Sequence, residues 1–345
     1  MFTPINLTFF LLLLPILTGA ACLLALAQTA AAPARPHATL CSLMLAMLSA
    51  VGCLFLARDG QATQLNSSQL VLSALGMLAA QTCAATLIDR TRRAGLLFGS
   101  LMGAWLFVQF GIGSLPSLLP AMPRSGLLLV VLAAASFMGL IGSNALPMHP
   151  LRFTASMQPR TQALPQSWIF TGQVLLALCC AVLGWAMEAA IAPLAYVNIA
   201  TSALVGAMAS LWLAQRGRHP TPLIKAGEGL VAGVLVALLC NGAASTALAC
   251  GVLASLCVTS AERMMHSLRI DDAPHLAGMV LLPAMLGLLV PGLLHGGVLA
   301  AQLQWLGASL GMGALAGILL WPLSMLLFGL QANARHVREG FSQVE

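Results

Sequence analysis

Charge is what this sequence has least of. Only 7% of its 345 residues are Asp, Glu, Lys or Arg, whereas an average soluble domain carries about 25%. The mean hydropathy is +0.94, and 59% of the residues are apolar. With so little polar surface to offer water, the chain is not expected to be a soluble enzyme, a disordered tail or a nucleic-acid-binding protein. The composition instead predicts an all-α membrane protein with several spans.

Metal and redox motifs are missing as well. The nine cysteines show no CxxC spacing, and most lie in apolar runs, which is typical of small buried side chains. No two of the seven histidines share a helix at the i, i+4 spacing of a zinc site. No nucleophile motif, acid–base pair or cofactor loop stands out. We therefore expect neither an enzyme nor a resident metal or cofactor.

Long apolar runs are what the sequence has in excess. A helix needs about 20 apolar residues to cross a bilayer, because lipid cannot satisfy exposed backbone groups. Eleven stretches meet this length or nearly so: 7–27, 39–57, 69–88, 94–112, 126–146, 167–187, 193–214, 224–240, 245–262, 274–294 and 302–328. A five-plus-five inverted repeat plus one extra helix gives this number and is a common transporter plan. One transmembrane domain over 1–330 with a short cytoplasmic tail over 331–345 is the simplest organisation.

The few basic residues indicate the orientation. With eleven spans, thirteen of the 15 Lys and Arg residues fall on one side, and only Arg58 and Arg124 fall on the other. The positive-inside rule places the richer side in the cytoplasm, so the N-terminus is expected outside and the C-terminus inside the plasma (inner) membrane. A cleaved signal peptide over 1–30 is the alternative for the first span, although no basic region precedes its apolar run.

Ionisable residues within spans are costly and are therefore functional candidates. Glu228 opens the eighth span and Glu262 closes the ninth, where solvated or salt-bridged carboxylates are expected. Lys225 counts with the cytoplasmic connection before the eighth span. The interior thus offers no charged path, so a permeant species should be small and neutral. Small-residue faces for close helix contact are predicted at Gly99, Gly103, Gly229, Gly233, Gly307, Gly311 and Gly313.

Four strings, in order along the chain, resemble motifs of the ammonium transporter (Amt/Rh) family. They are Asp89-Arg90 after the third span, Val197-Asn198-Ile199 in the seventh, Gly229 to Gly233 in the eighth and Ile270-Asp271-Asp272 before the tenth. From the residues alone, Asp89 and Arg90 form a local ion pair or cap, and Asp271 and Asp272 cap the tenth helix. Asn198 is expected to bond between helices. All five are interpreted as structural polar residues.

The resemblance implies a fold, an assembly and a pore. It covers nearly the whole chain and agrees with the eleven spans and their orientation. A member of this family is expected to form a homotrimer in which each subunit has its own pore for an ammonium-like or small neutral solute. Two pore histidines of the family align with Leu132 and Val280, and its two gating phenylalanines align with Val71 and Leu75. These four residues are therefore predicted to line the path, without the titratable groups of the family.

Three functions remain open from the sequence. The chain is an ammonium or ammonia channel with a plain hydrophobic pore, a non-conducting membrane sensor or assembly partner, or a transporter of another solute through a remodelled path. Loss of the pore residues prevents the family's function from being carried over directly. A sensor would need a cytoplasmic regulatory protein, and its predicted contact surface consists of Arg90–Arg93, Arg216–Lys225 and the Arg335–Glu345 tail.

Overall fold

The computed structural model describes residues 48, 67–85, 93–110, 125–145, 166–187, 193–240, 243–268, 270, 275–295 and 299–328. Its helices are α3 (Ser67–Ala85), α4 (Arg93–Gln109), α6 (Gly126–Ala145), α8 (Gln166–Met187), α9 (Pro193–Arg216), α10 (Pro222–Ala237), α11 (Ala244–Leu268), η3 (Ala277–Leu281), α12 (Leu282–His295) and α13 (Leu299–Phe328). Nine of the predicted spans fall in this part of the chain and coincide with these helices, η3 and α12 together forming the tenth. The predicted spans 7–27 and 39–57, and the alternative signal peptide, lie outside the described residues except for residue 48.

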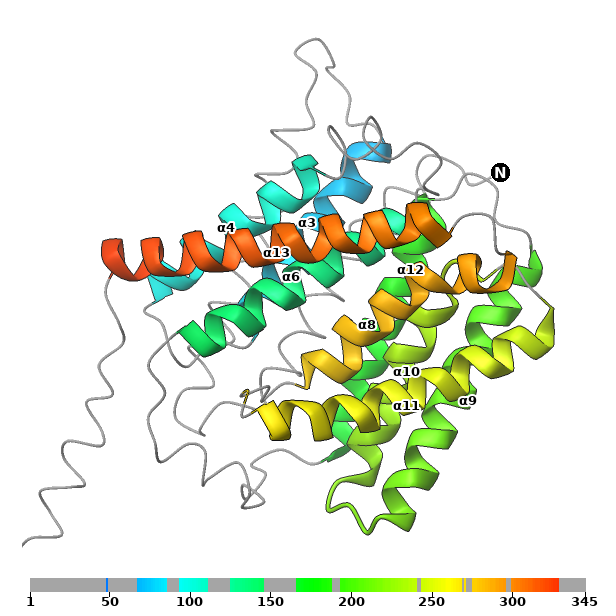
Figure 1. The fold of residues 1–345 in the computed structure, drawn as a ribbon. Helices are drawn as coiled ribbons and strands as arrows, with labels where there is room; N and C mark the ends of the chain where they lie inside the picture. Colours follow the sequence, from blue (N-terminus) through cyan, green and yellow to red (C-terminus); the bar gives the residue numbers. More distant parts are fainter. Residues whose placement is uncertain are drawn as a thin grey trace, which may run out of the picture.

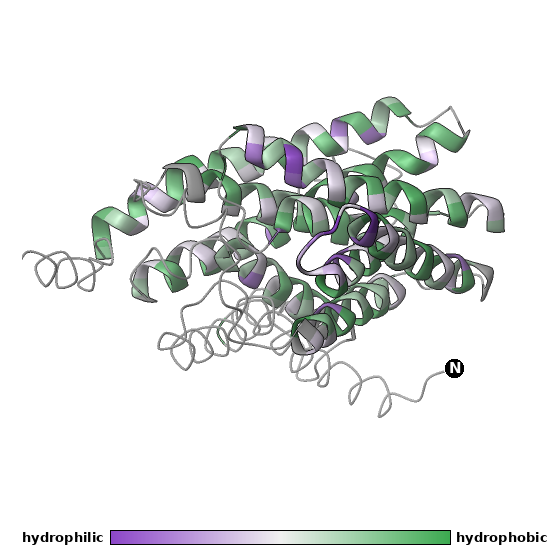
Figure 2. Ribbon diagram, turned by 90° about the horizontal axis from the view of Figure 1, so that it is seen from below, coloured by the Kyte–Doolittle hydropathy of each residue, from purple (hydrophilic) through white to green (hydrophobic). Residues whose placement is uncertain are grey.

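Hydrophobic residues surround most of these helices instead of forming one stripe. Figure 2 shows apolar colour along all of them, with a hydrophilic loop between α9 and α10. A helix that is apolar all round is buried in protein or in lipid. Among the described helices, five segments are long and apolar enough to cross a membrane, namely Ile169–Met187, Ala195–Arg216, Ala244–Leu268, Ala277–Leu294 and Leu299–Phe328. The molecule is thus all-helical in its described part, as predicted.

The helices form two groups that lie side by side. In Figure 1, α3, α4, α6 and α13 form one group, and α8 to α12 form the other. In the first group α3 packs against α4 and α6, and in the second α10 packs against α11, η3 and α12. The groups meet where α6 contacts η3 and α12, and where α3 contacts α8. The tenth span therefore lies at the boundary between the groups.

Glycine brings α10 against α9. A Cβ on Gly233 would lie 2.5 Å from the carbonyl oxygen of Ser202, so only glycine allows this approach. The Ser202 hydroxyl donates a hydrogen bond to the Gly233 carbonyl at 2.9 Å, which ties the two helices together. The predicted close contact at this position is confirmed. The helix also carries the residues of the site described below.

Two of the predicted glycine contacts are not made with any described part of the chain. No described atom lies within 4 Å of the place that a Cβ would take on Gly307 or Gly311, whereas the same atom on Gly313 would meet the backbone of Ala134. The three glycines lie on one helix, but only Gly313 faces α6. Spacing alone does not tell which side of a helix meets a neighbour.

The tenth span begins irregularly. His275 has a positive φ of 54°, and the next turn, η3, is a π-helix before α12 continues the span. A positive φ is uncommon for a residue with a side chain and costs conformational energy unless neighbouring groups hold it. Short π-helical turns are frequent at functional sites. This irregular start holds His275 next to α10.

Candidate functional site

The four predicted pore residues lie in one apolar core. Val71 and Leu75 come from α3, Leu132 from α6 and Val280 from η3, and their exposed fractions are 7%, 0%, 1% and 4%. These elements contact one another, α6 packing against both α3 and η3. Leu75 and Leu132 are thus almost completely buried. The arrangement is compatible with a central path that is closed at these residues, and their role in lining it stays a prediction.

Two polar side chains near this core, Thr82 and Ser136, form hydrogen bonds within their own helices. The Thr82 hydroxyl donates to the Leu78 carbonyl at 2.7 Å, and the Ser136 hydroxyl donates to the Leu132 carbonyl at 2.7 Å, both within their own helices. Gln81 of α3 differs, because its buried amide has no hydrogen-bond partner among the described residues. An unpaired buried amide is costly. Gln81 was not singled out from the sequence, which gives no sign of its burial.

A buried lysine lies at the start of α10, where the sequence predicted a cytoplasmic connection. The Lys225 ammonium group contacts the Glu228 carboxylate at 2.9 Å and the Glu262 carboxylate of α11 at 3.0 Å. The side chains of Lys225 and Glu228 are only 4% and 2% exposed, whereas that of Glu262 is 39% exposed. The salt-bridged alternative for the two glutamates is therefore confirmed, and the sequence did not predict that Lys225 is the buried partner of both.

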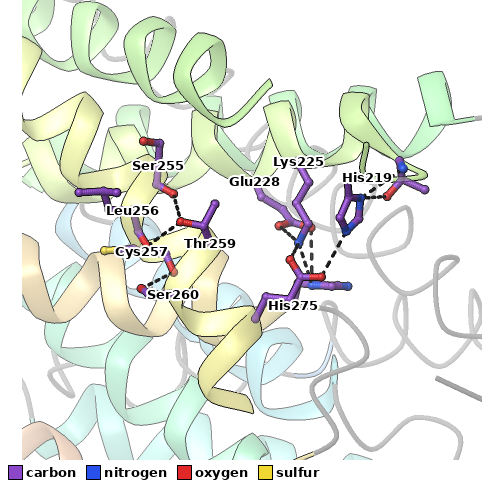
Figure 3. Close-up of polar contacts among 11 residues, drawn as sticks. His219, Lys225, Glu228, Ser255, Leu256, Cys257, Thr259, Ser260 and His275 are labelled. Carbon is purple, nitrogen blue, oxygen red and sulfur yellow. Dashed lines mark hydrogen bonds and ion pairs between the residues drawn. The ribbon is translucent and has the colours of Figure 1, made fainter. Parts of the chain in front are cut away.

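Two histidines extend this ion pair at both ends. His219, in the loop between α9 and α10, lies 3.2 Å from Glu262, and its other ring nitrogen accepts a hydrogen bond from the Thr221 backbone N–H at 3.2 Å. His275 Nδ1 lies 3.3 Å from Lys225 Nζ and 3.9 Å from Glu228 Oε1. Figure 3 shows His219, Lys225, Glu228 and His275 pointing toward one another from the loop, α10 and the start of the tenth span. We call His219, Lys225, Glu228, Glu262 and His275 the charged cluster.

The local sequence explains why the cluster forms here. Pro222 starts α10 and places Lys225 and Glu228 on the same face, three residues apart. Burial removes water from both charges, so the mutual attraction replaces their hydration. The sequence signal that could have indicated this pair is the i, i+3 Lys–Glu spacing inside the first turns of an apolar span. Among the described residues, no group of three His, Cys, Asp or Glu side chains could hold a metal ion.

A cavity opens beside the charged cluster. Its volume is about 540 Å³, and it lies between the last turns of α9 and the facing part of α11, with His219 and Lys225 on its wall. Small residues line the cavity on one side, Ala214 in α9 and Gly217 directly after it, opposite longer side chains on α11. The sequence analysis did not predict this cavity, because it depends on which faces of two distant helices meet.

The other predicted polar residues divide into two groups. Asn198 is 1% exposed within α9 and has a bonding partner, which agrees with a structural role. Asp89, Arg90, Asp271 and Asp272 lie outside the described residues, so their predicted capping and pairing roles stay predictions. The basic surface predicted for a regulatory protein is partly described: Arg216 lies 5.2 Å from the ring centroid of Trp212, in a cation–π contact.

Comparison with known proteins gives a fold. Neither a family model nor a curated protein matches the sequence. Among solved structures, Rh50 of Nitrosomonas europaea is similar with a TM-score of 0.78 and 16% identity, covering 97% of this chain and 94% of that one. The Candida albicans Mep2 mutant S453D has a TM-score of 0.73 and 15% identity, covering 95% and 86%. A sensor Amt protein has a TM-score of 0.73 and 12% identity, covering 95% and 94%.

These matches extend over nearly the whole length of both chains, although the sequences have diverged far. Sequence identity at this level shows the fold and leaves the activity open. Together with the apolar spans, they show a multi-pass membrane protein. The chain has the fold of the ammonium transporter (Amt/Rh) family.

Proposed function

We propose that this protein is a non-conducting member of the ammonium-transporter fold that acts as a membrane sensor or assembly partner. The observation that carries this proposal is the closed apolar core: Leu75 and Leu132 are 0% and 1% exposed, at the positions where the resemblance places the central path. An ammonium ion entering this core would lose its water, and the described helices α3, α6 and η3 offer it no Asp, Glu, Lys, Arg or His. The proposal excludes ion conduction and requires no catalytic chemistry.

The finer architecture of the proposal is a five-plus-five inverted repeat plus one helix. The packing of α3 against α4 and α6 has a counterpart in the packing of α10 against α11 and α12, which supports this plan. In the proposal α13 is the extra helix, and the two predicted spans 7–27 and 39–57 complete the first half. The protein would form a homotrimer in the plasma membrane, with the charged cluster on the cytoplasmic side and a regulatory protein as its partner.

A second candidate function is passage of neutral ammonia. The similarity to Rh50 of Nitrosomonas europaea, a protein of the Rhesus family of channels, favours it. A central path without charge suits a neutral solute better than an ion. Small rearrangements of Val71 and Leu75 would be enough to let so small a molecule through. The two candidate functions differ in the rate at which ammonia crosses the membrane, which can be measured.

The test uses the purified chain in proteoliposomes that contain a pH-sensitive dye. An ammonium chloride pulse alkalinises the lumen when ammonia enters, and a solid-supported membrane records any charge that crosses. We expect no current and the same alkalinisation rate as in protein-free liposomes, since ammonia crosses lipid on its own. Faster alkalinisation without current would replace the first candidate with the second. A current carried by ammonium would contradict both.

A further inference from the structure

The tenth span begins with a titratable side chain on an unusual backbone. His275 has a positive φ of 54°, and its carbonyl accepts a hydrogen bond from the Met279 N–H of η3 at 2.9 Å. Its side chain is 36% exposed, so protons from solution can reach the ring. Histidine is the side chain whose charge ordinarily changes between about pH 5 and about pH 8. A change of charge at His275 therefore acts at the first residues of the span.

The hydrogen bonds of the charged cluster indicate a neutral His275. The Lys225 ammonium group lies 3.3 Å from His275 Nδ1, 2.9 Å from Glu228 Oε2 and 3.0 Å from Glu262 Oε2. An ammonium group has three N–H donors and no acceptor, so these three contacts use all of its donors. Because Lys225 is the donor, His275 Nδ1 carries no proton, and the proton of the neutral ring lies on Nε2.

One buried acceptor of the cluster has no donor. Glu228 Oε1 is buried and has no hydrogen bond among the described residues, whereas Oε2 of the same carboxylate pairs with Lys225. His275 Nδ1 lies 3.9 Å from Glu228 Oε1, which is too far for a hydrogen bond. A buried carboxylate oxygen without a donor is costly. A proton on His275 Nδ1 would supply this donor after an approach of about 1 Å.

The charges on the neighbouring helices leave room for one more proton. The turn η3 contacts α6, α10, α11 and α12, and α6 carries no Asp, Glu, Lys, Arg or His. The ionisable groups on the other three helices are Lys225 and Glu228 of α10, Glu262, Arg263 and His266 of α11, and His295 at the end of α12. Arg263 and His266 line the cavity and form no ion pair with the cluster residues, all of which the structure describes. With neutral histidines the cluster holds one cation and two carboxylates, so a proton on His275 balances its charge.

We propose that His275 is a pH-sensitive switch that exchanges its hydrogen-bond partner on protonation. The neutral ring accepts a hydrogen bond from Lys225, as in this structure. A proton on Nδ1 places a second cation against the Lys225 ammonium group, so this contact breaks and Nδ1–H donates to Glu228 Oε1 instead. The exchange moves the ring at the start of the tenth span and leaves Lys225 with its two glutamates. It takes place whether or not the central path conducts, so its test is separate from that of the proposed function.

His219 serves as an internal control, because its protonation requires no new partner. Its Nδ1 accepts a hydrogen bond from the Thr221 N–H at 3.2 Å and lies 3.2 Å from the Thr221 hydroxyl, and its Nε2 lies 3.2 Å from Glu262 Oε1. When Nδ1 of this ring gains a proton, the Thr221 hydroxyl can accept it while Nε2–H stays bonded to Glu262. Both histidines therefore titrate, but only His275 changes its distance to a carboxylate.

Solid-state nuclear magnetic resonance follows this distance directly. The full chain, labelled with magnetic isotopes in the histidine rings and the glutamate carboxyl groups, is reconstituted in liposomes and measured at about pH 8 and at about pH 5. The nitrogen shift tells whether Nδ1 carries a proton, and the nitrogen–carbon dipolar coupling reports the distance to the carboxyl group. As His275 Nδ1 gains its proton, its coupling to Glu228 should rise by about twofold for an approach of about 1 Å. The coupling between His219 and Glu262 is expected at both pH values.

Variants assign these signals, and the wild-type spectra decide the outcome. His275→Gln removes the pH-dependent coupling, whereas His219→Gln, the matched control, removes only the constant coupling to Glu262. Glu228→Gln identifies the carboxyl group, because it removes the coupling of His275 and keeps that of His219. A coupling between His275 and Glu228 that is the same at both pH values, or a proton on His275 Nδ1 already at the higher pH, overturns the proposal.

Discussion

Replacing the buried lysine tests the charged cluster most directly. In Lys225→Met the ammonium group is lost while an unbranched side chain of similar length remains. Glu228, with a side chain 2% exposed, then keeps a buried charge with only His275 near it, at 3.9 Å. Glu262 suffers less, because its side chain is 39% exposed and His219 remains at 3.2 Å. The variant therefore measures chiefly the cost of one uncompensated buried carboxylate.

The expected loss of stability in Lys225→Met follows from the different burial of Glu228 and Glu262. Removing one partner of a buried ion pair costs about 3–5 kcal/mol, and we expect the lower end because His275 and water can respond. In a chain of this size that loss corresponds to a fall in melting temperature of roughly 5–10 °C. In the double variant Lys225→Met, Glu228→Gln, the second change removes the stranded charge. Its stability should return to within about 1–2 kcal/mol of wild type, since replacing both partners of a buried pair is often close to neutral.

A thiol-reactive dye suits the measurement. Cys83, Cys179 and Cys180 are buried and form no disulfide, so their thiols react with the dye only when the helices separate. The dye signal during heating therefore reports unfolding in detergent. Arg218→Met is the control for loss of a cation at an exposed position and should change the melting temperature by less than the error of the assay. If Lys225→Met melts with wild type, or if the double variant is no more stable than the single one, the reasoning about a buried, uncompensated carboxylate is refuted.

Two further predictions concern the packing of the helices. Gly233→Ala should lower the stability by about 1–3 kcal/mol, because its Cβ would lie 2.5 Å from the Ser202 carbonyl oxygen. Gly307→Ala is the control: with no described atom within 4 Å, it should be neutral or stabilising by up to about 1 kcal/mol. Equal melting temperatures of the two variants would contradict the contact between Gly233 and Ser202. The double variant Leu75→Ala, Leu132→Ala should enlarge the closed core, cost about 2–5 kcal/mol per site, and raise the ammonia flux in proteoliposomes above that of wild type. A flux unchanged in a folded variant would show that these residues do not close the path.

The helices could be predicted because long apolar runs can be found directly in the sequence. The predicted span 126–146 matches α6 at Gly126–Ala145, and 193–214 matches α9 at Pro193–Arg216, since lipid requires backbone groups to pair within each segment. Fold similarity to Rh50 agrees with the family suggested by short strings such as Val197-Asn198-Ile199. Each string alone is a weak indication of the family, and the prediction rests on their order along the chain.

The candidate site was harder to predict because it depends on facing helix surfaces. Lys225 lies three residues into a helix after a short basic loop, so its position along the chain is that of an interface residue. Its burial comes from α11, which supplies Glu262 from 37 residues later, and from His275, 50 residues later. The same limit explains why the sequence did not distinguish Gly307 from Gly313. Both are glycines of α13, but only Gly313 lies against a neighbouring described helix.

The distribution of charge gives the molecule two separable parts. The described helices around Leu132 and Val280, namely α3, α6 and η3, carry no Asp, Glu, Lys, Arg or His, so perturbing them should alter passage of a solute and leave the charged cluster unchanged. At the start of α10 five ionisable residues from four segments meet next to a cavity. The cavity wall is formed by α9, α11 and the loop between α9 and α10, and Lys225 on this wall contacts His275, which precedes η3 with Val280. The charged cluster therefore joins the cavity wall to the segment that carries Val280, and Lys225→Met, which changes that wall, should also remove the contact with His275.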